Sequence, residues 1–299
     1  MWFRNLQIYR LGDDWKWDAA RLSEKLAQSG FQACGAFDMQ SRGWVPPRGE
    51  EGELLVAVNR QWLIALGVEQ KLLPAAVIRQ YTQARVAELE AKQGFKAGRA
   101  QARDLREQVT AELLPRAFVQ RRLVYVWIDP INRWLVIDAA SPTKAEEVLE
   151  HLKGTLDDLP LRLLRTRTAP GTAMTGWLAG NEAPAGFSID RDCELSAAGE
   201  DKAVVRYVRH PLDGEEIGRH IATGKAVTRL AMTWRDRISF VLTEQLQVKR
   251  LAFLDILKEE AERQVEGGGE LFEADFALMS GELAPLMADL AAALDGEAE

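Results

Sequence analysis

The sequence has few of the residues that build covalent or metal-based sites. Its 299 residues include two cysteines, Cys34 and Cys193, and three histidines, His151, His210 and His220. The cysteines lack the spacing of a metal-binding or redox pair, and the histidines are not combined with carboxylates at ligand spacing. We therefore expect no disulfide framework, no zinc site and no cofactor.

Motifs that cradle phosphate or activate a nucleophile are also missing. The sequence contains no GxxxxGK(S/T), no GxGxxG after a strand pattern, no HExxH and no GxSxG. The N-terminus does not combine a basic region with an apolar run and a cleavage site, and no uninterrupted apolar stretch approaches membrane-spanning length. These absences predict a non-enzymatic, unprocessed cytoplasmic protein without a membrane partner.

Negative charge is in excess, but it is distributed unevenly. The formal net charge is -7 and the pI is near 5.3, which by itself argues against a nucleic-acid partner. Residues 71–122 nevertheless carry eleven bases and five acids, a net charge of +6, and residues 202–253 carry ten and five, a net charge of +5. After Leu254 there are two bases and thirteen acids. The two basic segments therefore belong to a chain that is acidic mainly because of its C-terminal region.

The apolar patterning predicts an α+β fold of antiparallel sheets with covering helices and a helical basic segment. A half-buried strand over Phe3–Leu11 is followed by a helix that begins at Asp18 and ends at Gly30. A hairpin of two apolar strands then recurs, each time leading into a helix. The strands are Leu54–Val58 with Trp62–Val68, Leu123–Ile128 with Trp134–Asp138, and Ala226–Thr233 with Arg237–Thr243 and Val248–Phe253.

Two turn-rich stretches, Ser41–Gly52 and Ala169–Gly186, are expected to be connections. The predicted organisation is an N-terminal sheet subdomain over 1–72, a helical basic segment over 73–118, a second hairpin-plus-helix subdomain over 119–165 and a C-terminal α+β subdomain over 166–299. Tryptophans in or beside the apolar strands are expected to pack in the core. They are Trp44, Trp62, Trp127, Trp134 and Trp234.

The helical basic segment supplies the first group of candidate DNA-binding residues. Good helix formers fill Pro74–Leu114, with Gly94 and Gly98 in the middle, so the segment is either one long helix or a helical hairpin. Cations recur at spacings of four and three, which places them on one face of a continuous helix. They are Lys92, Lys96, Arg99, Arg103 and Arg106. A row of charges of this length suits a phosphate backbone, and the alternative interpretation is a solvated helix face.

The second basic segment supplies a less regular group. Arg206, Arg209 and His210 lie in a short strand-like run, and Lys225 and Arg229 lie at the start of another strand. The alternation of residues does not place the two arginines of the first run on one side, so contact with phosphate is one interpretation and ordinary surface exposure the other.

Two rival functions come from different classes. The first is a metal-dependent nuclease in which Asp129 and Asp138, which flank a predicted hairpin, hold the metal ion. Turn and strand-end aspartates more commonly cap the backbone. The second is a protein-interaction module whose acidic C-terminal region binds a basic partner.

Several short blocks, in order along nearly the whole chain, resemble one known family. They are Trp2-Phe3-Arg4-Asn5-Leu6 with Tyr9-Arg10-Leu11, Gly43-Trp44-Val45-Pro46-Pro47, Leu113-Leu114-Pro115-Arg116-Ala117-Phe118, Trp127-Ile128-Asp129 and Leu278-Met279-Ser280-Gly281-Glu282-Leu283. Together with the length, these blocks resemble the recombination-associated RdgC family.

The resemblance implies a ring-shaped homodimer with a positively charged central hole. Such a ring would bind double-stranded DNA without sequence specificity, would restrain the RecA recombinase and would be nucleoid-associated in the cytoplasm; binding of single-stranded DNA stays open. By position, Phe118 matches a family phenylalanine at a dimer interface, and Arg209 and His210 match a basic-polar pair that faces DNA. No catalysis is implied.

Overall fold

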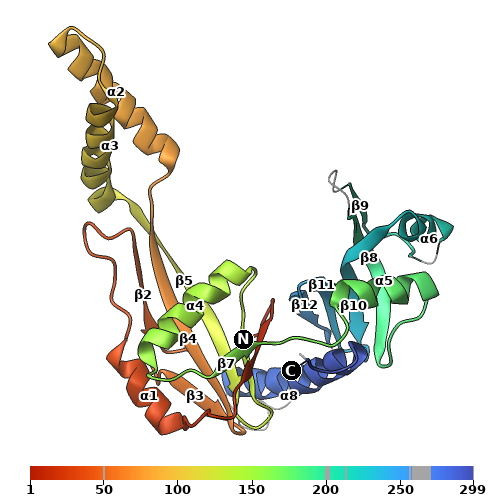
Figure 1. The fold of residues 1–299 in the computed structure, drawn as a ribbon. Coiled ribbons are helices and arrows are strands. Elements are labelled where there is room, and N and C mark those ends of the chain that lie inside the picture. Colours follow the sequence, from red (N-terminus) through yellow and green to blue (C-terminus); the bar gives the residue numbers. More distant parts are fainter. Residues whose placement is uncertain (50, 199–202, 213, 256, 258–270, 299) are drawn as a thin grey trace.

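The computed structural model of the chain describes residues 1–298 except 50, 199–202, 213, 256 and 258–270. These residues form two antiparallel sheets, one from each half of the chain, and a long C-terminal helix lies at the base between them (Figure 1). The two sheets stand as the limbs of an open V, and a pair of helices extends the first limb well beyond its sheet (Figure 1).

The first sheet has seven strands in the order β2-β4-β5-β6-β1-β7, and β3 pairs with β4 on the same edge as β2. Its strands are β1 (Gln7–Leu11), β2 (Gln40–Val45), β3 (Leu55–Val58), β4 (Gln61–Leu72), β5 (Phe118–Asp129), β6 (Trp134–Ile137) and β7 (Leu161–Leu163). The β4 and β5 strands pair along their whole length, from Trp62 opposite Ile128 to Leu72 opposite Phe118. One end of this pair is buried on both faces, and the other end is largely exposed.

The exposed end of the β4–β5 pair carries a helical arm. The arm consists of α2 (Ala75–Gln93), α3 (Arg99–Leu113) and a short 3-10 turn, Leu114–Arg116. Gly94 adopts a left-handed conformation at φ 79° and ends α2, so the basic segment is a hairpin and not one long helix. Within the two helices only Ile78 and Val109 are buried, which leaves most of the arm's surface accessible.

Two helices cover one face of the first sheet. These are α1 (Ala19–Gln28), which begins where the Asp18 side chain caps the backbone N–H of Arg21, and α4 (Pro142–Thr155). Apolar side chains of both helices pack with those of the sheet into one core cluster. Gly43 of β2 allows the chain to cross there, since a Cβ at this position would lie 2.3 Å from the Cα of Phe31.

The second sheet has five strands in the order β12-β11-β10-β8-β9. These are β8 (Phe187–Ala197), β9 (Val204–Tyr207), β10 (Lys225–Trp234), β11 (Ile238–Thr243) and β12 (Val248–Phe253), and the helices that pack with them are α5 (Pro170–Gly180), α6 (Glu215–Ala222) and α8 (Leu271–Ala293). Helices and the C-terminal part of the chain cover the face that carries residues such as Leu230, Met232 and Leu242. The opposite face carries Arg229 and Lys249 and lines an open pocket.

Helix α8 joins the two sheets into one hydrophobic core. A single cluster contains Phe276, Leu283 and Leu290 of α8 together with Trp127 of the first sheet and Trp234 of the second. By length and composition alone α8 could cross a membrane, contrary to the expectation from the sequence that no stretch comes close to doing so. Apolar side chains along it, among them Phe276, Leu283 and Leu290, are buried against protein and its acidic side chains are paired, so α8 is a core helix.

Most of the predicted elements are confirmed. The strands of all three hairpins are present, and the helices that follow Pro74 and Pro142 begin at those prolines. The third hairpin's helix falls mostly on residues 258–270, outside the described residues. The expected connections were partly wrong, because β2 (Gln40–Val45) overlaps Ser41–Gly52 and α5 lies within Ala169–Gly186. Both elements depend on tertiary contacts, β2 on its pairing with β4 and α5 on packing against β10.

A test of the shared core is the Leu283→Ala substitution in α8. Leu283 is fully buried, so we expect it to lower the free energy of unfolding by about 2–5 kcal/mol. Because α8 packs on both sheets, both should be lost in one urea transition. Leu271→Ala is the control, since Leu271 is 52% exposed and should change stability little. Separate transitions for the two halves would contradict a single core.

Candidate nucleic-acid interface

The five predicted cations of the helical arm lie at and near its tip. Lys92 is in the last turn of α2, Lys96 is in the connecting loop, and the arginines are on α3. All five side chains are exposed. The loop backbone is held by the Glu90 carboxylate, which accepts a hydrogen bond from the N–H of Ala97 at 2.8 Å. The predicted stripe is therefore divided between two helices and a fixed loop.

Few of these arm cations are neutralised. Arg103 lies 3.9 Å from Asp104 and 3.8 Å from Glu107, both exposed, so these contacts are weak. In the part of the chain that the structure describes, the other four have no carboxylate within 4.0 Å. By contrast, Arg85 on the same arm pairs with Glu112 at 3.1 Å. The tip of the arm thus presents positive charge that the fold leaves uncompensated.

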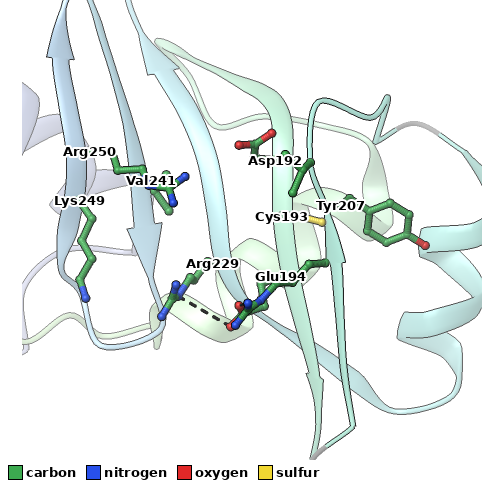
Figure 2. A pocket seen from close by; sticks show the side chains of 10 residues that line it. Asp192, Cys193, Glu194, Tyr207, Arg229, Val241, Lys249 and Arg250 are labelled. Atoms are coloured by element: carbon green, nitrogen blue, oxygen red, sulfur yellow. Dashed lines mark hydrogen bonds and ion pairs between the residues drawn. The ribbon is translucent and has the colours of Figure 1, made fainter.

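In the second sheet, two predicted arginines flank one carboxylate. Register places Glu194 of β8 between Arg206 of β9 and Arg229 of β10. The Arg206 Nε donates to Glu194 at 2.6 Å, whereas Arg229 is 3.8 Å away; the latter contact is drawn in Figure 2. Burial acts to raise the pKa of Glu194, but hydrogen bonds from Arg206 and Thr228 and the charge of Arg229 outweigh it and hold that pKa below its ordinary value. Glu194 is therefore ionised and holds both arginines on one face.

The remaining predicted cations of this group lie at turns around the same sheet. Arg209 follows β9 with φ 53°, and its N–H donates to the Asp192 carboxylate at 2.7 Å. The exposed His210 donates its backbone N–H to the carbonyl of Arg191. Lys225, at the start of β10, is half-buried and lies 3.3 Å from the ring of His220. Arg206, Arg209 and Arg229 lie on one sheet, while the arm cations lie on the other limb of the V (Figure 1).

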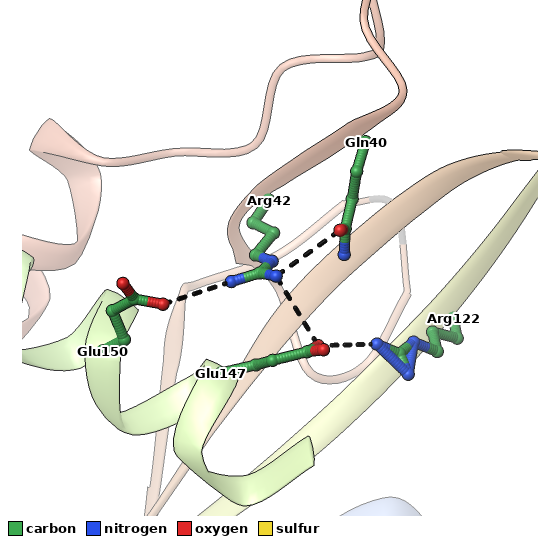
Figure 3. Close-up of polar contacts among 5 residues, drawn as sticks. All are labelled: Gln40, Arg42, Arg122, Glu147 and Glu150. Carbon is green, nitrogen blue, oxygen red and sulfur yellow. Dashed lines mark hydrogen bonds and ion pairs between the residues drawn. The ribbon is translucent and has the colours of Figure 1, made fainter. Parts of the chain in front are cut away.

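Other arginines of the first limb are occupied by carboxylates. Arg122 of β5 donates to Glu147 of α4 at 2.9 Å, and Arg42 of β2 lies between Glu147 and Glu150 (Figure 3). This network joins α4 to the sheet. Arg122 was counted in the first basic segment, but its charge is paired with Glu147 within the fold.

Five carboxylates in the described part of the C-terminal region take part in internal ion pairs. Glu273 pairs with Arg48, Glu282 with Arg237, Asp289 with Arg235 and Glu297 with Arg10, and Asp275 binds the N-terminal ammonium group. These five carboxylates connect parts of the fold and are therefore not free to bind a basic partner.

Asp129 and Asp138, the two aspartates of the nuclease alternative, lie apart from each other, and each accepts hydrogen bonds from backbone N–H groups. Asp129 is fully buried and accepts from the N–H groups of Ile131 and Asn132, each at 3.0 Å. Asp138 accepts from the N–H of Asn5 at 2.9 Å and lies opposite Tyr125. Tyr125 and Asp129 are four residues apart on one strand, about 13 Å. The carboxylates are therefore too far apart to share one metal ion, and no group of three metal-ligating side chains occurs among the described residues.

Phe118 is the first residue of β5, and its side chain is 85% exposed. Exposed apolar neighbours adjoin it, since Leu72 is opposite Phe118 in the register and Val119 follows it. Leu72 and Phe118 form an apolar patch on one face of the sheet at the base of the arm, and Val119, the next residue of β5, points to the opposite face. A patch of this kind on an otherwise polar surface is typical of a contact with another molecule.

Lys249 and Arg250 of β12 were not predicted from the sequence to belong to the interface. Consecutive strand residues point to opposite faces, so alternation alone separates the two side chains. The structure places both beside Arg229 in one pocket. The sequence did contain a sign of this arrangement. The apolar residues Val248 and Leu251, both buried, are three positions apart, and this spacing breaks the strict alternation of a regular strand.

The described residues thus define an α+β protein with two antiparallel sheets, one shared core and two surfaces of exposed cations. A family model described as "Putative exonuclease, RdgC" matches residues 1–297. The chain is 56% identical to the "Recombination-associated protein RdgC" of Dechloromonas aromatica, over 99% of this chain and 98% of that protein. It is 53% identical to the proteins of the same name from Janthinobacterium sp. (strain Marseille) and Herminiimonas arsenicoxydans, over at least 99% of both chains. The chain belongs to the RdgC family.

Asp138 gives a prediction about pH. Burial raises its pKa above the ordinary value of 3.8, outweighing the hydrogen bonds from Asn5 and Arg4. The folded state therefore favours the protonated acid, so its contribution to stability is full below about pH 3.8 and is lost as the pH rises through the folded-state pKa. In urea titrations, wild type should lose stability relative to Asp138→Asn between pH 4 and 7.

Asp157→Asn is a control of opposite sign, because Lys25 lowers the pKa of the exposed Asp157 by a hydrogen bond and by its charge. Wild type should gain stability relative to this variant as the pH rises to about 3.8, weakly because the group is exposed, and should change little relative to it between pH 4 and 7. The same pH trend in both comparisons would show that burial of Asp138 is not the cause.

Proposed function

We propose that the chain binds double-stranded DNA through the phosphate backbone, without reading base sequence. The observation that carries this proposal is that most of the predicted DNA-binding side chains have no carboxylate partner. Of the ten, only Arg103, Arg206 and Arg229 have a carboxylate within 4.0 Å in the described part of the chain. The other seven are Lys92, Lys96, Arg99, Arg106, Arg209, His210 and Lys225. Unpaired cations favour an anionic partner.

The arrangement of the arm cations suits a polymer. Arg99, Arg103 and Arg106 lie within the first eight residues of α3, about 10 Å along the helix axis, and Lys96 extends the row into the loop. A row of charges of this kind matches the regular spacing of backbone phosphates better than one small anion.

The family supports the same partner. The relatives are named recombination-associated proteins, and recombination acts on DNA. We infer that this chain acts in the cytoplasm on nucleoid DNA and restrains recombination by RecA, because a protein that covers the backbone competes with a recombinase for the same polymer. Single-stranded DNA carries the same phosphates and is a second expected ligand.

We further propose that two copies form a ring-shaped homodimer. Each chain is an open V that carries cations on both limbs, and a second copy would close the opening around a duplex (Figure 1). The apolar patch of Leu72 and Phe118 lies at the base of the arm and would form one contact. Carboxylates of α8 are paired within the fold, and the exposed cations of the two limbs would place positive charge towards the enclosed DNA although the chain as a whole is acidic.

The proposal predicts a steep salt dependence without sequence preference. Duplexes of unrelated sequence should bind with equal affinity, and log K should fall linearly with log salt, with a slope of about -0.9 for each phosphate neutralised. Arg99→Gln with Arg106→Gln should weaken binding to every duplex and make the slope shallower by about 0.9 for each phosphate that is no longer neutralised. Fluorescence anisotropy over a salt series measures both quantities.

The matched control for these variants is Arg85→Gln. Arg85 lies on the same arm, but its guanidinium group is already paired with Glu112, so the slope of log K against log salt should not change in this variant. Preference for one sequence, or an equal effect of all three substitutions, would contradict backbone binding by unpaired cations.

The homodimer is tested by Phe118→Ser. This change removes apolar area from the patch without affecting the core, because Phe118 is exposed. We expect a shift towards monomer in sedimentation velocity and faster release of the protein from circular DNA at raised salt. Ile131→Ser, at the other end of β5, is the control, because Ile131 is also exposed. An unchanged sedimentation profile for Phe118→Ser would exclude this contact.

A further inference from the structure

The open face of the second sheet has a pocket lined mainly by charged side chains. Its volume is 240 Å³, and strands β8, β9, β10, β11 and β12 all contribute to it. Figure 2 shows Lys249 and Arg250 of β12 across Val241 of β11 from Arg229 and Glu194. Four of the ten lining residues are lysine or arginine, and two are acidic.

A β-bulge in β12 places two consecutive cations in this pocket. The register with β11 shifts between the pairs Ser239–Ala252 and Val241–Lys249, and Arg250 lies in the shifted stretch with φ 52°. A bulge re-aims side chains, so Lys249 and Arg250 both line the pocket. Left-handed backbone is uncommon for arginine, and such residues gather at functional sites. The bulge thus combines a left-handed backbone at Arg250 with a place for its side chain in the lining of the pocket.

The cations of the pocket are not balanced by its acids. The Asp192 carboxylate is occupied by the N–H of Arg209, and Glu194 is bound most closely by Arg206 at 2.6 Å. Among the residues that the structure describes, Lys249 and Arg250 have no carboxylate within 4.0 Å. Burial and then the charge of Arg229 lower the pKa of Lys249, which shows that its ammonium group is partly desolvated beside a like charge. An anion placed there would relieve this repulsion.

We propose that Arg229, Lys249 and Arg250 together bind one phosphate group of a nucleic-acid backbone. Guanidinium groups bind phosphate through paired hydrogen bonds, and the ammonium group adds a point charge. Glu194 is a positioning residue, because it holds Arg229 and Arg206 on the open face. The inference rests on the proposed DNA binding and adds a subsite on β12. A free phosphate ion has the same chemistry and is separated from a backbone phosphate by the test.

The test combines Lys249→Gln with Arg250→Gly. Glycine adopts positive φ without strain, so this substitution removes the charge while relaxing the backbone, and the variant should unfold at no lower urea concentration than Lys249→Gln alone. Removal of one phosphate contact should make the slope of log K against log salt for duplex binding shallower by about 0.9 per site. The control is Arg60→Gly in the β3–β4 turn, since Arg60 is also exposed and left-handed, at φ 63°. Its slope should equal that of wild type.

A second arm of the test uses inorganic phosphate with the wild-type protein. The side-chain NMR signal of Lys249, assigned by its absence from the spectrum of Lys249→Gln, should shift on phosphate addition and its pKa should rise. Acetate at equal ionic strength should have little effect. An equal response to acetate would overturn the proposal in favour of a carboxylate-bearing partner.

The two arms separate the two proposals. If wild type binds duplex and the double variant retains the wild-type slope, the subsite is wrong and DNA binding stands. If wild type does not bind duplex, DNA binding is wrong; a Lys249 response to phosphate then assigns the pocket to free phosphate, and no response overturns the subsite as well.

Discussion

The structure depends on the burial of α8 between two sheets. Trp127 of the first sheet and Trp234 of the second belong to the same hydrophobic cluster as α8, while a second cluster packs the other face of the first sheet against α1 and α4. The indole N–H of Trp234 donates to Asp289 of α8 at 2.8 Å, so the polar end of the ring is also satisfied. Because the helix fixes both sheets, it also fixes the opening between the limbs, where the exposed cations lie (Figure 1).

The same helix accounts for the charge distribution. Four carboxylates of α8 pair with the N-terminal ammonium group or with arginines from other elements, so these negative charges are used at internal contacts. Lys92, Lys96, Arg99 and Arg106 of the arm, and Lys249 and Arg250 of the β12 bulge, have no such partner among the described residues. A net charge of -7 therefore coexists with two positive surfaces, because the fold pairs the carboxylates of α8 and leaves this subset of the bases without carboxylate partners. Net charge alone is a poor guide to the partner of such a chain.

The two cationic surfaces differ in how they are built. The arm is a thinly packed hairpin in which the exposed helix faces present charge, so several single substitutions there should be tolerated by the fold. The pocket of the second sheet depends on strand register, on the bulge at Arg250 and on Glu194 between two arginines. The arm is therefore suited to adaptable contact with a long polymer. The pocket of the second sheet is suited to binding one phosphate group at a defined position.

Local patterning determined the hairpins, the helices that begin after Pro74 and Pro142, the basic arm and the buried tryptophans, because alternation, helix periodicity and capping are properties of neighbouring residues. The family resemblance also lay within short blocks of sequence. Tertiary structure decided what patterning could not: that β2 pairs with β4, that Arg122 is neutralised while Arg99 is not, that Asp129 and Asp138 are apart, and that Lys249 and Arg250 share a pocket. Each outcome depends on which distant strands become neighbours, and that choice is made by burial of apolar surface in the shared core.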